Sequence, residues 1–134
     1  TNEYKLLQLV LLGQIELHQK IIHIANFFDR ISFKYNLNPL TLEETKEMIE
    51  FRIRKAGYQS KMHIFLKEAV KEIHEATHGY PRRIIMLCHK ALKELILKNQ
   101  SVVDANLIGE IVKAEIQAGW HTNEKNPLLL KNSY

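Results

Sequence analysis

The stretch at residues 77–92, THGYPRRIIMLCHKAL, joins two predicted helices and decides how the larger part of the chain folds. Gly79 suits the end of one helix, because glycine adopts left-handed backbone conformations at little steric cost. Pro81 suits the first position of the next helix, where its missing N–H removes no helical hydrogen bond. Arg82 and Arg83 follow at once and open an otherwise apolar segment. Their charges are unfavourable with the dipole of a helix N-terminus, so their placement needs an explanation.

Two more helices are predicted, one before and one after this pair, because apolar residues recur every three to four positions along residues 41–119. Thr41 and Glu44 form the capping-box pattern at the start of the first of them. The other limits are predicted from polar N-caps at Ser60 and Asp104 and from glycines at 57, 79 and 119. The side chains expected to face the core are Leu42, Thr45, Ile49, Ile53, Ala56, Met62, Phe65, Leu66, Ala69, Val70, Ile73, Ala76, Ile85, Cys88, Leu92, Leu95, Ile96, Leu107, Ile108, Ile111, Val112 and Ile116. Residues 38–119 are therefore expected to form a four-helix bundle, followed by an irregular tail at residues 120–134.

The first 37 residues have a different pattern, which predicts a βαβ unit. Residues 5–13, KLLQLVLLG, are a short apolar run typical of a buried strand, and residues 14–30 have apolar positions at helical spacing. Residues 31–37, ISFKYNL, alternate apolar and polar side chains as a second strand would. Two strands do not form a stable sheet by themselves, so we expect residues 1–37 to be the edge of a larger α/β core. The expected fold class is mainly α, with a short βαβ remnant ahead of the helical bundle.

Composition limits the function without identifying it. The net charge of +4 is compatible with nucleic acid, an acidic membrane surface or bound phosphate as partner. The single cysteine, Cys88, lies in an apolar segment, which indicates a reducing compartment and a thiol used as a small core side chain. No apolar run is long enough to span a bilayer, and the first residues lack the layout of a signal peptide. We therefore expect a cytoplasmic protein.

The 134 residues contain no complete catalytic motif. The sequence has no G-x-x-x-x-G-K-[ST] phosphate loop and no G-x-S-x-G elbow, and residues 74–78, HEATH, match the H-E-x-x-H zinc motif in letters alone. Seven histidines are present, and His74 and His78 are spaced to share one helix face. No cluster of cysteines or carboxylates accompanies them, so no metal site is expected.

Three polar residues at predicted element boundaries are the candidates for chemistry. Gln14 directly follows the first predicted strand, and ligands of open α/β sheets bind outside the carboxyl ends of strands. Arg30 closes the helix after it, and Arg82 opens the third helix of the bundle. A phosphate at that helix start would be favourable, because the backbone N–H groups and the guanidinium would face the same negative charge.

Each candidate also has a purely structural interpretation. The Arg82 side chain could pair with Glu75, and the amide of Gln14 could bind a loop carbonyl. Arg30 could pair with an acidic neighbour, either Asp29 or Glu16. For Arg83 we expect only packing or a surface position, and for Trp120 a role in closing the last helix onto the core.

Three segments, taken in order, resemble a known family. Residues 9–17 (LVLLGQIEL), 29–57 (DRISFKYNLNPLTLEETKEMIEFRIRKAG) and 77–92 are similar to the C-terminal half of AAA+ ATPases. The pattern resembles the ExeA/GspA-type general secretion pathway ATPases most, with the TniB/TnsC-type transposition ATPases next. The resemblance runs from about Leu6 to Ile116. Its motifs are individually short, and their order and spacing make the match specific.

The resemblance implies that residues 1–37 are the C-terminal edge of a P-loop ATPase core and that residues 38–119 are its helical lid. Arg82 in GYPRR matches the sensor 2 arginine, which binds nucleotide phosphates from the lid. Gln14 matches the sensor 1 position, and Arg30 matches an arginine finger that acts on a neighbouring subunit. ATP and magnesium are the implied cofactors of the full-length protein. Self-association and secretion-apparatus partners are implied as well, at the cytoplasmic face of the inner membrane.

The sequence departs from the family pattern at two positions beside these residues. Ile15 stands where relatives usually have proline, and Asp29 where they often have glutamine. The phosphate-loop lysine and the magnesium-binding acidic motif would precede Thr1. We therefore expect the 134 residues alone to bind no cofactor and to be inactive as an ATPase. Two alternatives stay open, namely a DNA-binding module of a transposition regulator and a domain that acts by protein contact alone.

Overall fold

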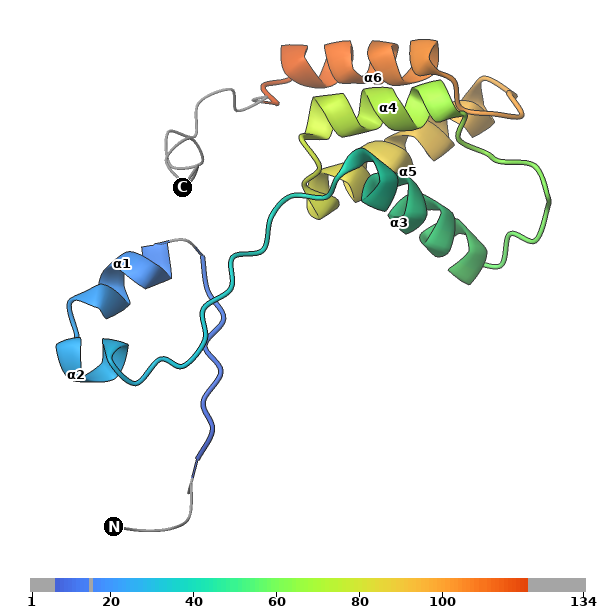
Figure 1. Cartoon of the computed structure of the whole chain (residues 1–134). Helices are drawn as coiled ribbons and strands as arrows, with labels where there is room; N and C mark the ends of the chain where they lie inside the picture. Colours follow the sequence, from blue (N-terminus) through green and yellow to red (C-terminus); the bar gives the residue numbers. More distant parts are fainter. Residues whose placement is uncertain (1–6, 15, 121–134) are drawn as a thin grey trace. The chain divides into compact units, whose positions relative to one another are not determined.

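The computed structural model describes residues 7–14 and 16–120, which divide into two compact units. The first unit ends at Leu37 and contains α1 (Glu16–Ile22) and α2 (Ala25–Phe28). The second begins at Asn38 and contains α3 (Leu42–Lys55), α4 (Lys67–Thr77), α5 (Pro81–Leu97) and α6 (Ala105–Gln117). Figure 1 shows these four helices packed together as a bundle. The described part of the protein is mainly helical, as predicted.

The βαβ prediction for residues 5–37 is wrong for the described part of that segment. Neither residues 7–14 nor residues 31–37 form a strand, and the single helix predicted at 14–30 is broken into α1 and α2. The physical reason is that a strand satisfies its backbone groups only by pairing with a neighbour. The apolar side chains of both segments are exposed instead, for example Leu7 and Phe33 at 79% each.

Contacts within the first unit are few and polar or aromatic. The Nζ atom of Lys34 lies 2.8 Å from Nε2 of His18, which joins the segment after α2 to α1. The His18 ring also meets the Phe28 ring edge-on, with the centroids 6.0 Å apart. These contacts tie α1, α2 and residues 31–37 to one another.

Three of the four helix starts in the second unit, those of α3, α5 and α6, follow the residues that the sequence predicts. Oγ1 of Thr41 accepts a hydrogen bond from the backbone N–H of Glu44 at 3.3 Å, and the Glu44 carboxylate accepts one from the Thr41 N–H at 2.8 Å. This capping box is confirmed, and its hydrogen bonds lower the pKa of Glu44. Asp104 caps α6 by accepting from the N–H of Leu107 at 2.8 Å, and Pro81 is the first residue of α5.

The predicted start of α4 at Ser60 is wrong, because the helix begins only at Lys67. Residues 64–66 are held extended by the loop before α6. The Leu66 N–H donates to the Val103 carbonyl at 3.0 Å, and the Val103 N–H donates to the Ile64 carbonyl at 2.7 Å. This parallel bridge sets the starts of α4 and α6 side by side, and the two helices pack along each other (Figure 1).

The core lies among the four helices of the second unit. Its fully buried centre includes Ile73 of α4, Ile84 of α5 and Ile108 of α6. The predicted stripe of α5 is partly wrong: Ile84, Leu87 and Ala91 form the buried face, whereas Ile96 is 77% exposed. Residues 84–88 are all apolar, so spacing alone does not determine which side of α5 faces inward. Packing against α3, α4 and α6 determines it.

Exposure also corrects five other predicted core positions. Met62 lies in the loop before α4 and is exposed because the helix starts later than predicted. The others lie at or near helix ends, beyond the packed centre, and are exposed too: Leu42, Ala56, Leu66 and Ile116.

Candidate functional site

The start of α5 is the candidate site of the second unit. Tyr80 occupies the N-cap position without a capping side-chain hydrogen bond, and the first turn of this 17-residue helix contains no acidic residue. The Arg82 side chain at the second helical position is exposed. Among the described residues it makes no hydrogen bond or ion pair. A helix start without negative charge, carrying an available guanidinium, favours an anion.

The ion pair considered between Arg82 and Glu75 is not formed. The Glu75 carboxylate lies 3.8 Å from Nζ of Lys71, one turn earlier on α4. Glu75 is thus engaged within its own helix, and the structure leaves Arg82 available for another partner.

The turn before Arg82 is held in place by the segment that precedes α3. The backbone N–H of Leu40 donates a hydrogen bond to the carbonyl oxygen of Gly79 at 2.8 Å. Gly79 has a φ of +72°, and a Cβ atom at this position would lie 2.1 Å from the Leu40 oxygen. Both the backbone conformation and the close approach therefore require glycine here. The predicted end of α4 shifts slightly, since the helix ends at Thr77 and His78 is also left-handed, with a φ of 53°.

Arg83 has a packing role, as predicted. Its guanidinium lies 5.8 Å from the centroid of the Tyr80 ring and 5.9 Å from that of the Trp120 ring. Trp120 reaches this position because α6 ends in a left-handed Gly119, after which the Trp120 N–H donates to the Glu115 carbonyl at 2.8 Å. Trp120 packs against the core and closes α6 onto it, which confirms the prediction for this residue.

Gln14 and Arg30 belong to the first unit, and both are exposed. The carbonyl oxygen of Gln14 accepts from the Leu17 N–H at 2.9 Å at the start of α1. Arg30 follows the C-cap of α2, and its N–H donates to the Phe27 carbonyl at 3.1 Å. Neither side chain is engaged by the described residues, so the loop-carbonyl contact of Gln14 and the acidic pairing of Arg30 are not formed among them. Ile15 and residues 121–134 of the predicted irregular tail lie outside the described residues.

The groove next to Pro81 is unsuitable for a phosphate on its own. It is an open hollow of about 750 Å³ lined mainly by α3, with Leu40 and Pro81 at one side. Four carboxylates line it against two cations: Glu43, Glu44, Glu47 and Glu50 against Lys46 and Arg54. Because this lining repels anions, a phosphate at Arg82 needs further cationic or N–H groups from outside this groove.

The hollow between α5 and α6 is charged but internally neutralised. It has a volume of about 290 Å³, and its lysines and glutamates form ion pairs across the two helices. Lys90 pairs with Glu115, and Lys98 pairs with Glu110. These pairs stabilise the packing of the two helices and leave little net charge for a ligand.

Cys88 and the histidines carry no site chemistry in the described part of the chain. Burial raises the pKa of the Cys88 thiol to about 12, and the positive charge of Arg52 offsets only part of this rise. Nδ1 of His74 lies 3.1 Å from Oγ1 of the buried Thr45, which joins α4 to α3. Within residues 7–14 and 16–120, no group of three metal-ligating side chains is found. No helix in those ranges is long and apolar enough to cross a bilayer.

Comparison with known proteins adds two relatives to this description. The chain is 36% identical over 94 residues to General secretion pathway protein A from Aeromonas hydrophila. It is 31% identical over 84 residues to an uncharacterised HTH-type transcriptional regulator from Methanocaldococcus jannaschii. These matches cover 69% and 61% of the chain.

The matched part is small in each relative, with 17% of the first and 20% of the second covered. No family model matches the chain, and no solved structure matches it. The described part of the chain is thus mainly helical, and Arg82 is available at the start of α5. Its similarity to General secretion pathway protein A supports the resemblance to the secretion-type group.

Proposed function

We propose that the chain is the C-terminal part of an AAA+ ATPase of the general secretion type, in which Arg82 binds the phosphates of ATP from a helical lid. The observation that carries the proposal is the exposed Arg82 side chain, without a partner among the described residues, at the uncapped start of α5. The relative named General secretion pathway protein A supports the class.

Residues 1–37 complete the proposal as the edge of the ATPase core. The exposed apolar side chains of residues 7–12 and 31–37 fit segments that would pair with strands of a longer chain. Gln14 would then face the nucleotide as sensor 1, and Arg30 would reach the nucleotide of a neighbouring subunit.

Magnesium-bound ATP supplies the phosphoryl group and the negative charge that these residues recognise. The fit of this chain to ATP rests on Arg82, since the guanidinium and the N–H groups of the α5 start can hold phosphate oxygens. The hydrogen bond between Leu40 and Gly79 fixes the turn from which Arg82 projects. The lid would then orient the phosphate, whereas the rest of the longer protein would bind magnesium and position the attacking water.

The test is the substitution Arg82→Ala in the full-length protein. Loss of one charge-assisted contact is worth about 1.5–3 kcal/mol, so we expect ATP turnover to fall by roughly 10- to 100-fold. Arg82→Lys should keep part of the activity, and Lys93→Ala on the same helix is the matched control. Unchanged turnover in a folded Arg82→Ala protein would show that Arg82 is not a sensor.

Arg30 needs a different experiment, because a finger acts on the neighbouring subunit. Mixing Arg30→Ala subunits with subunits defective in their own nucleotide site should restore part of the turnover if Arg30 acts in trans. If mixing restores nothing, the proposed role of Arg30 is wrong.

A second candidate function is a nucleic-acid-binding module, which the similarity to the HTH-type transcriptional regulator favours. The net charge of +4 is compatible with it. Binding of the chain to arbitrary DNA, weakening steeply as salt is raised, would support this candidate. Absence of binding at low salt would exclude it.

A further inference from the structure

Positive charge is concentrated in one short stretch of the chain. Residues 50–63, EFRIRKAGYQSKMH, contain four lysines and arginines and one glutamate, a net charge of +3. The whole chain carries +4, so the other 120 residues contribute only +1. Cations in the last turn of α3 are favourable with the helix dipole. That effect does not explain Lys61, which lies beyond the helix, or the exposed aromatic rings among the charges.

The end of α3 folds Tyr58 back beside the last helical turn. Gly57 is left-handed, with a φ of +96°. The Gly57 N–H donates to the Arg54 carbonyl at 3.0 Å, and the Tyr58 N–H donates to the Ile53 carbonyl at 3.3 Å. This pair of bonds is a Schellman motif, which reverses the chain at a helix C-terminus. Tyr58 is therefore held close to the cations of the last turn.

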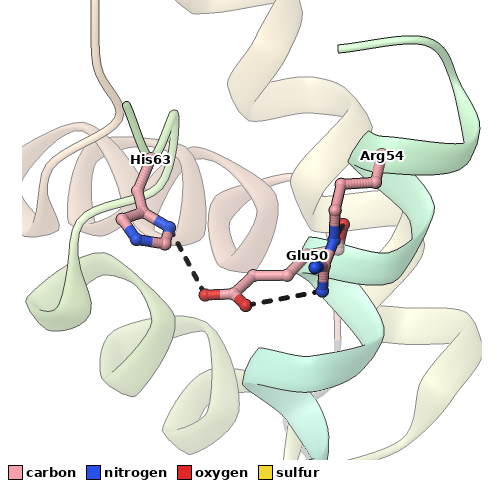
Figure 2. Close-up of polar contacts among 3 residues, drawn as sticks. All are labelled: Glu50, Arg54 and His63. Atoms are coloured by element: carbon pink, nitrogen blue, oxygen red, sulfur yellow. Dashed lines mark hydrogen bonds and ion pairs between the residues drawn. The ribbon is translucent and has the colours of Figure 1, made fainter. Parts of the chain in front are cut away.

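The loop after Tyr58 is attached to α3 a second time, through Glu50. Figure 2 shows the Glu50 carboxylate between Arg54 of the same helix and His63 of the loop before α4. Oε1 of Glu50 lies 3.4 Å from Nδ1 of His63, and Oε2 lies 3.9 Å from a guanidinium nitrogen of Arg54. Lys61 stands in the sequence between the two attachment points, Tyr58 and His63, so the loop that carries it is fixed to α3 on both sides of it.

Two aromatic rings are exposed on this surface. Phe51 is 57% exposed and Tyr58 is 36% exposed. The Nζ atom of Lys55 lies 5.6 Å from the centroid of the Phe51 ring, as expected for residues one turn apart on a helix face. We call Phe51, Arg54, Lys55, Tyr58 and Lys61 the α3-end surface. Phe51 and Arg54 also border the acidic groove next to Pro81, whereas Lys55 and Lys61 do not line it. A phosphate on this surface is therefore favoured near Lys55 and Lys61 rather than beside the glutamates of the groove.

We propose that the α3-end surface binds single-stranded nucleic acid, with its three cations on phosphates and its two rings against unpaired bases. Cations interleaved with exposed aromatic side chains are the combination that single strands require, since every unpaired base offers a flat face for stacking. A duplex hides those faces, so it would use the cations alone. The inference rests on the second candidate function and specifies its surface and its ligand. It requires neither Arg82 nor a nucleotide.

The experiment measures the binding of the 134-residue chain to a fluorescent 20-nucleotide oligothymidylate by anisotropy, at 50 and 150 mM salt. The surface variant is Arg54→Gln/Lys55→Gln/Lys61→Gln. The control, Lys71→Gln/Lys93→Gln/Lys113→Gln, removes the same charge from α4, α5 and α6. We expect at least a tenfold loss of affinity for the surface variant and less than a threefold loss for the control. The salt slope of the surface variant should fall by about 2, because single strands lose about 0.7 per phosphate contact.

Phe51→Ala tests the stacking contribution without removing charge. We expect it to weaken binding of the oligothymidylate at least fivefold and binding of a 20-base-pair duplex less than twofold. Phe51 is exposed, so circular dichroism should show an unchanged helical content. Met86→Ala, which trims an exposed side chain on α5, is the matched control and should leave both affinities unchanged.

Four outcomes would overturn the inference. Equal losses of affinity in the surface variant and the control variant would mean that the oligonucleotide is attracted by the overall charge of the chain and not by the α3-end surface. A duplex bound more tightly than the single strand would refute the assignment to single strands. Binding to phosphatidylglycerol vesicles in place of the oligonucleotide would assign the surface to a membrane. Absence of any nucleic-acid binding would exclude the second candidate function too, whereas the ATPase proposal would still be tested by Arg82.

Discussion

At the residue scale, Gly79 combines a left-handed backbone with a close approach to the Leu40 backbone, and both require glycine. It joins α4 to α5, and its carbonyl receives the hydrogen bond from Leu40. A side chain there would meet the Leu40 backbone, which cannot move without shifting the start of α3. The GYPRR stretch thus has a structural requirement for glycine that is independent of any role of Arg82.

We expect Gly79→Ala to destabilise the second unit by at least about 2 kcal/mol, from left-handed strain and the clash with Leu40. Gly109 provides the opposite control, because it lies inside α6 and a Cβ atom there has nothing within 4 Å. Gly109→Ala should stabilise the protein by about 0.5–1 kcal/mol. Urea unfolding followed by circular dichroism measures both, and equal effects of the two substitutions would contradict the assignment.

The raised pKa of the Cys88 thiol leads us to expect that the folded protein loses stability at alkaline pH. Its pKa rises from an ordinary value of 9.0 to about 12 in the folded protein because the thiol is buried. The unfolded chain therefore releases the proton first, and stability falls as pH rises from about 9 toward 12. The slope from this group is at most about 1.4 kcal/mol per pH unit.

Unfolding of the natural chain and of Cys88→Ala should be compared between pH 8 and pH 10.5. The difference in unfolding free energy between them should shrink as pH rises, since only the natural chain has the thiol. In the folded protein, a thiol reagent should react with the partly buried Cys88 far more slowly than with the unfolded chain. Rapid reaction at pH 7.5 would show that the thiol is accessible.

At the scale of elements, the helices that carry their own caps were predictable from the sequence. Thr41, Pro81 and Asp104 determine where α3, α5 and α6 begin through contacts within one turn. The start of α4 was not predictable in this way. Residues 64–66 pair with Val103, which lies far along the chain, and this pairing overrides the local signal at Ser60.

The junction between the end of α6 and the start of α5 is another contact that spacing does not predict. The Arg83 guanidinium lies near both the Tyr80 and Trp120 rings, so it joins the two helix ends. Trp120 is the only tryptophan of the chain, and its fluorescence therefore reports on this junction alone.

We expect Arg83→Ala to shift the Trp120 emission to longer wavelength and to destabilise the protein by about 0.5–1 kcal/mol, the range of a partly exposed cation–π contact. Arg82→Ala is the neighbouring control and should leave the emission unchanged, because the ring of Trp120 is met by the guanidinium of Arg83 and not by that of Arg82. An identical spectrum for the two variants would mean that Arg83 does not hold the end of α6.

At the scale of the whole molecule, the two units differ in how much of their structure could be predicted from the sequence. The second unit buries its apolar side chains among its own helices, so short-range patterns predicted most of it. The apolar pattern of residues 7–12 and 31–37 has no partner strand among the described residues, and the predicted sheet edge did not form. The candidate site also has a predictable and an unpredictable part. The GYPRR motif identified Arg82 from the sequence. The contacts that Leu40 and Trp120 make with this stretch were visible only in the folded structure.

This difference predicts that the second unit folds without the first. A protein comprising residues 38–134 keeps the whole core formed by α3 to α6. We therefore expect a cooperative thermal transition within a few degrees of that of the 134-residue chain. It should also remain monomeric at higher concentration, because the exposed apolar residues of the first unit, such as Leu7 and Phe33, are removed. Circular dichroism and light scattering after size exclusion measure the two effects. Loss of the cooperative transition in residues 38–134 would show that the first unit contributes to the core.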